Sequence, residues 1–308
     1  MAEIDTLKVA EGIHQIDTRC YDMPRFLASY LVVSDKIALI DSGPTTAVDN
    51  VLEGIRELGF AFKDIDYVVL THIHLDHGGG AGTMLKELTN ARVIVHDRGA
   101  RHVIDPTRII EGQIQFGGED ALRMDGYPIA VDADRVVAAA DGDEIDLGGG
   151  RKLRLLHIPG HTRTAMAIYD EKTRGLFPGD SLGVYRTEID VLIPAAPSPD
   201  FDLEVSLDSI KKMAGLPVDL ILLAHFGAST KVAHIQELAP QRLSYWCRKV
   251  EGWMKEVSPE EVGRKLKADL VGDLEPLPDK GALYEYFTGD LAEMSANAIM
   301  GYLQRKSP

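Results

Sequence analysis

The chain has 308 residues, a formal net charge of −15 and 45% hydrophobic residues, which is an ordinary composition for a globular protein with a large core. The acidic excess argues against a nucleic-acid partner and against an anionic membrane surface, because both are usually bound through basic patches. Cys20 and Cys247 form no Cys-x-x-Cys pair, which argues against a thiolate metal site or a disulfide framework. The first twelve residues lack the apolar segment of a secretory signal, and no apolar run reaches the roughly 18 residues of a membrane span. We therefore expect a cytoplasmic protein.

Strand and helix patterns alternate along most of the chain. Short apolar or alternating segments predict strands over residues 12–17, 28–33, 37–41, 67–70, 91–96, 151–158, 166–170, 174–180 and 218–225. Amphipathic spacing predicts helices over residues 46–59, 81–88 and 203–214, and a helical insert over residues 99–127. Two groups of strands with helices between them predict two sheets with helices outside.

The strand pattern stops after residue 231. Residues 232–308 are predicted to be mostly helical, with an interruption at 271–281. We predict a catalytic domain over residues 1–231 and a helical C-terminal extension over residues 232–308 that packs on it. Aromatic residues at partly helical spacing in this extension are typical of a core or an interface. We expect them to cover the mouth of a site or to make a homodimer contact, and the insert 99–127 is the other candidate lid.

Three histidines and one aspartate lie within six residues, directly after the apolar strand 67–70. They are His72, His74, Asp76 and His77, and three glycines follow at which the chain turns. Alternation along an extended chain points His72 and His74 to the same side, while Asp76 and His77 can face a second point beside the first. Neutral imidazole and carboxylate are ligands of zinc and other borderline divalent metals. This short segment can therefore supply two neighbouring metal ions.

Further candidate ligands stand where later strands end. His161 lies in a Pro-Gly-His-Thr turn, Asp180 follows a Pro-Gly pair, and His225 ends the predicted strand 218–225. Glycines and turns beside these residues let the backbone approach a metal closely. A surface histidine or a turn-capping aspartate is the alternative for each residue alone, but their joint position after buried strands favours a metal site.

Five motifs in this order resemble those of the metallo-β-lactamase-fold superfamily, in its glyoxalase-II-like branch. They are IALIDSG at 37–43, THIHLDH at 71–77, PGHT at 159–162, PGDS at 178–181 and AHFG at 224–227. The resemblance implies an α/β protein with a four-layer αββα sandwich and a dinuclear site between the sheets. It assigns one metal to His72, His74 and His161, the other to Asp76, His77 and His225, and a bridging position to Asp180.

The resemblance extends to two further residues. It implies that Asp41 orders the loop beneath the ligands, although a capping carboxylate after a strand is an equal alternative. After Asp180 the chain departs from true glyoxalase II and from the persulfide dioxygenases, which bind glutathione through this stretch. Residues 180–225 resemble an archaeal and bacterial subgroup of ester- and lactone-cleaving members. Tyr185 is a candidate to place a hydroxyl near the substrate carbonyl, as a tyrosine does in lactonase relatives, and a packed aromatic residue is the alternative.

The chemistry of such a site is hydrolytic. Two divalent metals roughly 3.5–4 Å apart can share a water and lower its pKa towards about 7, which yields hydroxide at neutral pH. We predict hydrolysis of an ester, lactone, thioester or related acyl or phosphoester, with Asp76 orienting the hydroxide and carrying a proton to the leaving group. Zinc is the expected metal, with iron or manganese as alternatives, and the expected partner is a small-molecule substrate. Two other functions stay open, which are a mononuclear iron persulfide dioxygenase and a metal-stabilised binding protein without catalysis.

Overall fold

The computed structural model describes residues 4–278 and 280–306. The chain forms two compact units, and each of them is built from separate stretches of sequence. We call the first the sheet unit, which takes residues 1–157, 164–179 and 218–230. We call the second the helical unit, which takes residues 158–163, 180–217 and 231–308. The chain leaves the sheet unit for the last time between residues 230 and 231. The predicted domain boundary, which follows residue 231, lies one residue further along the chain. The division into two domains stays a prediction.

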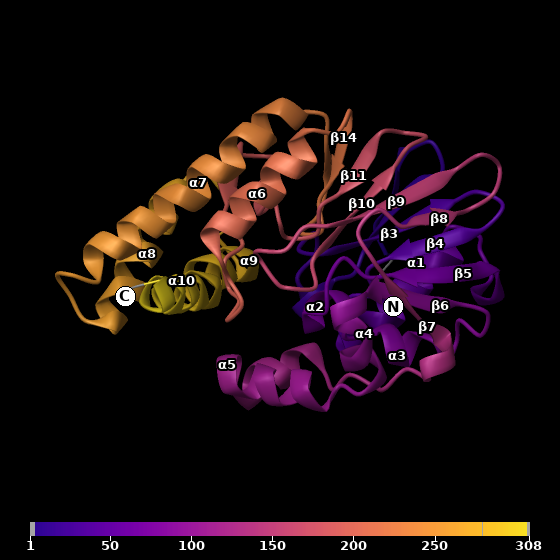
Figure 1. The fold of residues 1–308 in the computed structure, drawn as a ribbon, viewed down its shortest axis with the longest axis horizontal. Helices are drawn as coiled ribbons and strands as arrows, with labels where there is room; N and C mark the ends of the chain where they lie inside the picture. Colours follow the sequence, from indigo (N-terminus) through magenta and orange to yellow (C-terminus); the bar gives the residue numbers. More distant parts are fainter. Residues whose placement is uncertain (1–3, 279, 307–308) are drawn as a thin grey trace. The chain divides into compact units, whose positions relative to one another are not determined.

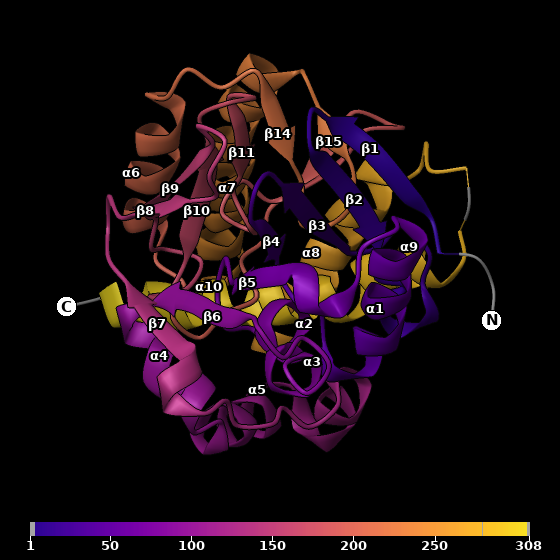
Figure 2. The same cartoon turned by 90° about the vertical axis from the view of Figure 1, so that its right-hand side faces the viewer.

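The sheet unit contains two sheets (Figures 1 and 2). The first has seven strands in chain order, which are β1 (Thr6–Ala10), β2 (Ile13–Asp17), β3 (Ala28–Val33), β4 (Ile37–Ile40), β5 (Ile65–Val69), β6 (Arg92–His96) and β7 (Val136–Ala139). Neighbours from β1 to β4 pair antiparallel, and those from β4 to β7 pair parallel. Helices connect the parallel strands, since a parallel pair needs a long crossover. They are α1 (Val48–Glu57), α2 (Leu75–Gly78), α3 (Ala81–Met84), α4 (Asp97–Ile104) and α5 (Thr107–Asp125).

The second sheet has six strands in the order β15-β14-β11-β10-β9-β8. They are β8 (Glu144–Asp146), β9 (Lys152–His157), β10 (Met166–Asp170), β11 (Gly175–Phe177), β14 (Leu220–Leu222) and β15 (Ala228–Ser229). Only β11 and β14 pair parallel, and the other neighbours pair antiparallel. The carboxyl ends of β5, β9, β11 and β14 lead into the segments that carry the predicted ligands.

Side chains of the first sheet alternate between two hydrophobic clusters. Tyr30 and Ile40 join Leu155 and Phe177 of the second sheet in a cluster that holds the two sheets together. Leu31, from the opposite face of β3, joins a second cluster with residues of α1, α3 and α4. Because successive strand residues point to opposite faces, the first sheet is buried on both sides. This two-sided burial makes β4 to β6 a rigid base for the segments that follow them.

A buried ion pair closes the end of the sheet unit away from those segments. Arg151 donates from Nε to Asp170 Oδ1 at 3.1 Å and from Nη2 to Asp170 Oδ2 at 2.8 Å. Its Nη1 donates to the carbonyl oxygens of Glu11 and Val33 at 3.1 and 3.0 Å. Both charged side chains are almost fully buried. The pair therefore ties β3 of the first sheet to β10 of the second through four hydrogen bonds from one guanidinium.

The helical unit contains a short hairpin and a set of packed helices. The hairpin pairs β12 (Val184–Arg186) with β13 (Val191–Ile193). The helices are α6 (Leu203–Ala214), α7 (Val232–Trp253), α8 (Pro259–Asp273), α9 (Ala282–Tyr286) and α10 (Ala292–Lys306), with a π-helical turn at Phe287–Leu291. Trp246 and Phe287 are fully buried, so part of the aromatic set lies in the core of this unit. The gap between α8 and α9 falls within the predicted interruption at 271–281.

Several predicted bounds differ from the observed elements. The helix predicted over 81–88 ends as α3 at Met84, the strand predicted over 218–225 is β14 at Leu220–Leu222, and the insert 99–127 divides into α4 and α5. The sequence pattern also missed β1, β7, β8, β15 and the hairpin β12–β13, which are short or carry polar residues and depend on distant partners. Within residues 4–278 and 280–306, no helix combines the length and the apolar character of a membrane span. The predicted cytoplasmic location stays a prediction.

Candidate metal centre

The histidine-rich segment begins where β5 ends. His72 is fully buried, and its Nε2 lies 3.1 Å from Nδ1 of the half-buried His74. This contact confirms that the two histidines converge, as alternation predicts. Asp76 and His77 lie in the helical turn α2, which begins at Leu75, before the glycines. His77 Nε2 lies 3.3 Å from Asp76 Oδ2.

Asp41 is the common acceptor beneath this segment. It follows β4, is buried, and accepts the Thr71 backbone N–H at 2.7 Å and the Thr71 hydroxyl at 2.8 Å. Its Oδ2 also lies 3.2 Å from His77 Nδ1. Asp41 has a left-handed backbone conformation with φ of 57°, which aspartate tolerates better than most residues. The predicted position of Asp41 beneath the ligands agrees with these contacts, whereas its effect on a metal stays a prediction.

These hydrogen bonds fix the tautomers of two histidines. A carboxylate only accepts, so His77 must donate from Nδ1 to Asp41. Thr71 gives its only hydroxyl proton to Asp41, so its oxygen accepts from His72 Nδ1 at 3.1 Å. In a neutral imidazole the other nitrogen then carries the lone pair. His72 and His77 therefore both present Nε2 as a ligand atom.

His225 completes a group within the sheet unit. It follows β14, and its side chain is buried. One ligand atom each of Asp76, His77 and His225 lies within 4.8 Å of the others. The ring of Phe26 packs against His225 with 5.1 Å between the centroids. A carboxylate and two imidazoles at this spacing fit a divalent cation of the zinc, iron or manganese class.

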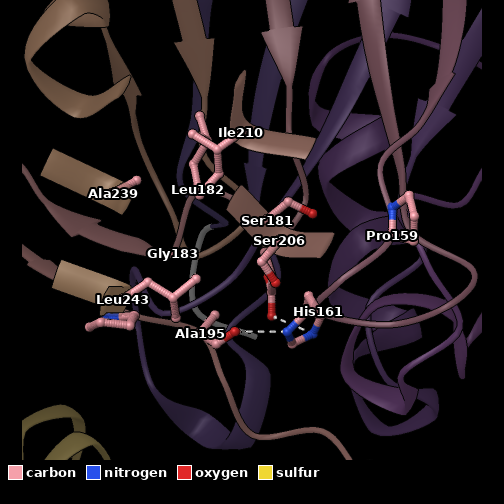
Figure 3. Close-up of a pocket in the computed structure, with 12 residues that line it drawn as sticks. Pro159, His161, Ser181, Leu182, Gly183, Ala195, Ser206, Ile210, Ala239 and Leu243 are labelled. Carbon is pink, nitrogen blue, oxygen red and sulfur yellow. Dashed lines mark hydrogen bonds and ion pairs between the residues drawn. The ribbon is translucent and has the colours of Figure 1, made fainter. Parts of the chain in front are cut away.

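The helical unit carries the other two predicted ligands. His161 donates from Nδ1 to the Ala195 carbonyl at 2.9 Å (Figure 3), so its Nε2 carries the lone pair. That Nε2 lies 3.6 Å from Asp180 Oδ2, and both side chains are buried. They line a small pocket together with Ser181, Leu182 and residues of α6 and α7 (Figure 3).

Gly160 is required for the position of His161. Its φ is 130°, and a Cβ at this position would lie 2.5 Å from the backbone nitrogen of Ser206 at the start of α6. The Gly160 carbonyl accepts the Asp202 N–H at 3.0 Å, which holds the turn against the helix. Any side chain at residue 160 would therefore displace the turn that carries His161.

The structure thus brings five of the seven predicted ligands together in the sheet unit and two in the helical unit. Their assignment to two metals stays a prediction.

Tyr185 is buried in β12, and its hydroxyl donates to Asp190. Burial, together with Asp190, raises the pKa of Tyr185. Its contacts are those of a packed aromatic residue, and its role with substrate stays a prediction.

Two polar residues near the sheet-unit group were missed from the sequence. Tyr21 donates its hydroxyl to Asp125 Oδ1 at 2.5 Å, and Asp125 is buried at the end of α5. Burial, followed by the charge of Asp76, raises the pKa of Asp125 to about 7. Tyr21 and Asp125 are 104 residues apart in the chain, so no local pattern could have paired them.

Comparisons with known proteins identify the family of the chain. Residues 23–225 match the family model of the metallo-beta-lactamase superfamily. A metallo-beta-lactamase fold-containing protein of Sulfurisphaera tokodaii is 29% identical over 239 residues, which are 76% of this chain and 85% of that protein. A solved metallo-beta-lactamase family protein from Thermus thermophilus is 22% identical with a TM-score of 0.68, and the match covers 97% of this chain and 95% of that chain. A hydroxyacylglutathione hydrolase of Rhodopseudomonas palustris is 28% identical over 148 residues, which are 46% of this chain and 44% of that protein.

The predicted fold class is confirmed by the family match together with the two mixed sheets, the helices and the C-terminal helical region. At the level of the family, this supports an enzyme, because the superfamily is mostly hydrolytic. The match over residues 23–225 covers well over half of the sequence. The chain therefore belongs to the metallo-β-lactamase superfamily.

Proposed function

We propose that the protein is a hydrolase that uses two divalent metal ions on a small ester or lactone. The observation that carries the proposal is the group of the part-buried Asp76 with the buried His77 and His225, whose ligand atoms lie within 4.8 Å of one another. The hydrogen bond from His77 Nδ1 to Asp41 supports it, because a carboxylate behind a histidine fixes the ring and raises its basicity as a ligand.

We propose further that all seven predicted ligands serve one dinuclear centre. Support comes from the motif order and from the chain itself. His161 lies in the six-residue segment 158–163 of the helical unit, which in the sequence stands between two stretches of the sheet unit. Asp180 is the first residue of the helical unit after the sheet-unit stretch 164–179. His161 and Asp180 also face each other within the helical unit, at 3.6 Å. The proposed assignment gives His72, His74 and His161 to one ion, gives Asp76, His77 and His225 to the other, and places Asp180 between them.

The side chains of the sheet unit then have separate tasks. When bound, divalent ions lower the pKa of water towards about 7 and polarise a substrate carbonyl. Asp41 and Thr71 keep the Nδ1 protons on His77 and His72, so the Nε2 atoms stay ligands throughout. The Asp76 side chain is 20% exposed, whereas that of His77 is fully buried. Asp76 is therefore the group placed to accept a proton from the attacking water and to return it to the leaving group.

The substrate class follows from the stretch after Asp180. This stretch does not resemble the glutathione-binding residues of glyoxalase II. The match to the hydroxyacylglutathione hydrolase covers 46% of this chain. We therefore propose an ester or lactone rather than a glutathione thioester. Zinc is the proposed metal, because imidazole and carboxylate are ligands that it commonly takes.

A turnover screen tests the proposal. The protein loaded separately with zinc, manganese and iron is assayed on aryl esters, lactones, thioesters, phosphodiesters and a β-lactam. We expect ester or lactone turnover in at least one metal form, and we expect Asp76→Asn to remove most of it. Asp49→Asn, an exposed substitution in α1, is the matched control and should keep wild-type activity. Turnover of no substrate class in any metal form would contradict the proposal and favour a binding protein.

A further inference from the structure

The turn that carries His161 rests on α6 and on the residue that precedes this helix. The Gly160 carbonyl accepts the backbone N–H of Asp202 at 3.0 Å, and the Pro159 carbonyl accepts the Ser209 hydroxyl at 2.6 Å. Pro159 and His161 border one pocket together with residues of α6 (Figure 3). The backbone position of this turn therefore depends on where α6 lies.

Asp202 joins the turn to the helix. Its side chain caps α6 by accepting the Val205 N–H at 3.2 Å, and its carbonyl accepts the Ser206 hydroxyl at 2.7 Å. Its backbone N–H is the group that donates to Gly160. A shift in the first turn of α6 therefore reaches the turn of His161 through a single residue.

The residue before this cap is held by α10. Phe201 is buried, and its carbonyl accepts a hydrogen bond from Arg305 Nη2 at 2.9 Å. The buried ring of Tyr302 packs edge-on against the ring of Phe201, with 5.6 Å between the centroids. Aromatic pairs in this arrangement stabilise a contact beyond the burial of their surface. Phe201 is thus fixed to the end of α10 through both its backbone and its side chain.

The same tyrosine also holds the first turn of α6. The Tyr302 hydroxyl donates to Glu204 Oε2, and Lys306 Nζ lies 3.0 Å from that oxygen. The hydrogen bond from Tyr302 is the main cause that lowers the pKa of Glu204 to about 2, so the carboxylate is ionised at neutral pH. The pair of Glu204 with Lys306 is exposed, and such ion pairs contribute little. The buried Tyr302 is therefore the main contact that fixes the start of α6 to α10.

We propose that α10 positions His161 as a metal ligand and that Tyr302 is the residue through which it acts on α6. This inference rests on the proposed function, in which His161 binds one of two ions. The Ala195 carbonyl fixes the ring of His161, whereas α6 fixes the backbone of its turn. Both are needed, because a ligand has to be held within about 0.5 Å of its productive position. Tyr302 is a positioning residue in this account, because it acts on the metal centre through α6.

A matched pair of tyrosine variants tests this role. Tyr302→Phe keeps the ring against Phe201 and removes the hydroxyl from Glu204. Tyr245→Phe is the control, because it removes the same kind of hydrogen bond between α7 and α8, where Tyr245 donates to Asp269 at 3.1 Å. We expect one of two zinc ions to bind about fivefold more weakly to Tyr302→Phe, the scale of one hydrogen bond, and with unchanged affinity to Tyr245→Phe. Competition with a chromogenic chelator measures the affinity. Equal losses in the two variants, or no loss in Tyr302→Phe, would overturn the inference.

A variant between Tyr302 and His161 tests the route through α6. Ser209→Ala removes the hydroxyl that holds the Pro159 carbonyl and leaves the contacts of α10 in place. We expect the affinity for one zinc ion to fall by about fivefold or more, because this hydroxyl contacts the turn directly. An unchanged zinc affinity in Ser209→Ala would contradict positioning through α6.

A double variant asks whether Tyr302 acts through His161. The proposed centre retains one ion in His161→Ala. Adding Tyr302→Phe to this variant should leave the affinity for the remaining ion unchanged, because no ligand is left for α10 to position. A further loss as large as that in the wild-type background would show a general loosening of the fold and would overturn the inference.

The metal-free protein separates failure of this inference from failure of the hydrolase proposal. His161 donates its Nδ1 proton to Ala195, and the exchange of this proton with solvent is measured by NMR on protein with isotope-labelled histidine. His161→Ala identifies the signal by its absence. We expect exchange to be severalfold faster in Tyr302→Phe than in the wild type and in Tyr245→Phe. If the protein binds no zinc but shows this difference, the proposed metal centre fails and the positioning stands. Equal exchange rates in the three proteins refute the inference.

Discussion

The sheet unit and the helical unit hold their histidines in different ways. In the sheet unit, His77 donates from Nδ1 to the buried carboxylate of Asp41, which also accepts two bonds from Thr71. In the helical unit, His161 donates from Nδ1 to the backbone carbonyl of Ala195. A carboxylate fixes the ring and adds negative charge behind it, whereas a carbonyl chiefly fixes the ring. In the proposed centre, the carboxylate that stands behind a ligand histidine therefore belongs to the sheet unit.

The two units also differ in what fixes their shape. Both faces of the first sheet are buried in the sheet unit, and the Arg151–Asp170 pair locks its strands. The helical unit relies on helix packing and on close turns such as that at Gly160. Substitutions in the sheet unit should therefore act through charge and strand packing, and those in the helical unit through turn geometry.

Removing one histidine from each unit gives the largest expected effect. His225→Ala in the sheet unit and His161→Ala in the helical unit should each lower the metal content by about one ion per chain, because each takes a ligand from a different proposed ion. Elemental analysis after dialysis and the ester assay measure the effect, and turnover should be lost in both. His102→Ala on α4 is the control. If His161→Ala retained full metal content and turnover, the helical unit would have no part in the centre.

Breaking the buried ion pair tests the packing side of the comparison. Arg151→Ala leaves the fully buried Asp170 without its partner, and we expect the free energy of unfolding to fall by about 3–5 kcal/mol. The neighbouring Lys152 forms an exposed pair with Glu144, and Lys152→Ala should cost no more than about 1 kcal/mol. Urea unfolding measures both. Similar losses in the two variants would show that the buried pair does not lock the sheets.

Neutralising Asp41 tests the electrostatic support. Asp41→Asn keeps the size of the side chain but removes the charge that faces Thr71 and His77, and we expect metal affinity to fall about 10–100-fold. Competition with a chromogenic chelator measures the affinity. Asp35→Asn, an exposed substitution after β3, should leave it unchanged. An unchanged affinity in Asp41→Asn would place the support of the ligands elsewhere.

A pH dependence of the stability is also expected from Asp125. Its pKa is raised from 3.8 to about 7, first by burial and then by the charge of Asp76. Between these values the folded metal-free protein keeps a proton that the unfolded chain has released, so stability falls as pH rises from about 4 to about 7, by at most about 1.4 kcal/mol for each pH unit. Asp125→Asn should remove this slope in urea unfolding at several pH values. An identical slope in wild type and variant would show that Asp125 titrates normally.

Local patterns predicted the parts of the site that lie close together in the sequence. Alternation after β5 placed His72 and His74 side by side, because the chain is still extended there. The family resemblance supplied Asp41, whose contacts with Thr71 and His77 span some thirty residues. Tyr21 and Asp125 could not be predicted, because their contact depends on how α5 returns to the β2–β3 loop. The predicted end of the helix over 81–88 was wrong for a similar reason: α3 ends at Met84, because tertiary packing overrides helix propensity.

Metal analysis of the aerobically purified protein tests the central claim most directly. Elemental quantification against protein concentration, with parallel assays of ester hydrolysis and of oxygen uptake on a persulfide, distinguishes the functions. We expect about two zinc ions per chain, loss of ester turnover with a chelator, and recovery on zinc addition. A single iron per chain with oxygen uptake on the persulfide and no ester turnover would contradict the account and identify a dioxygenase.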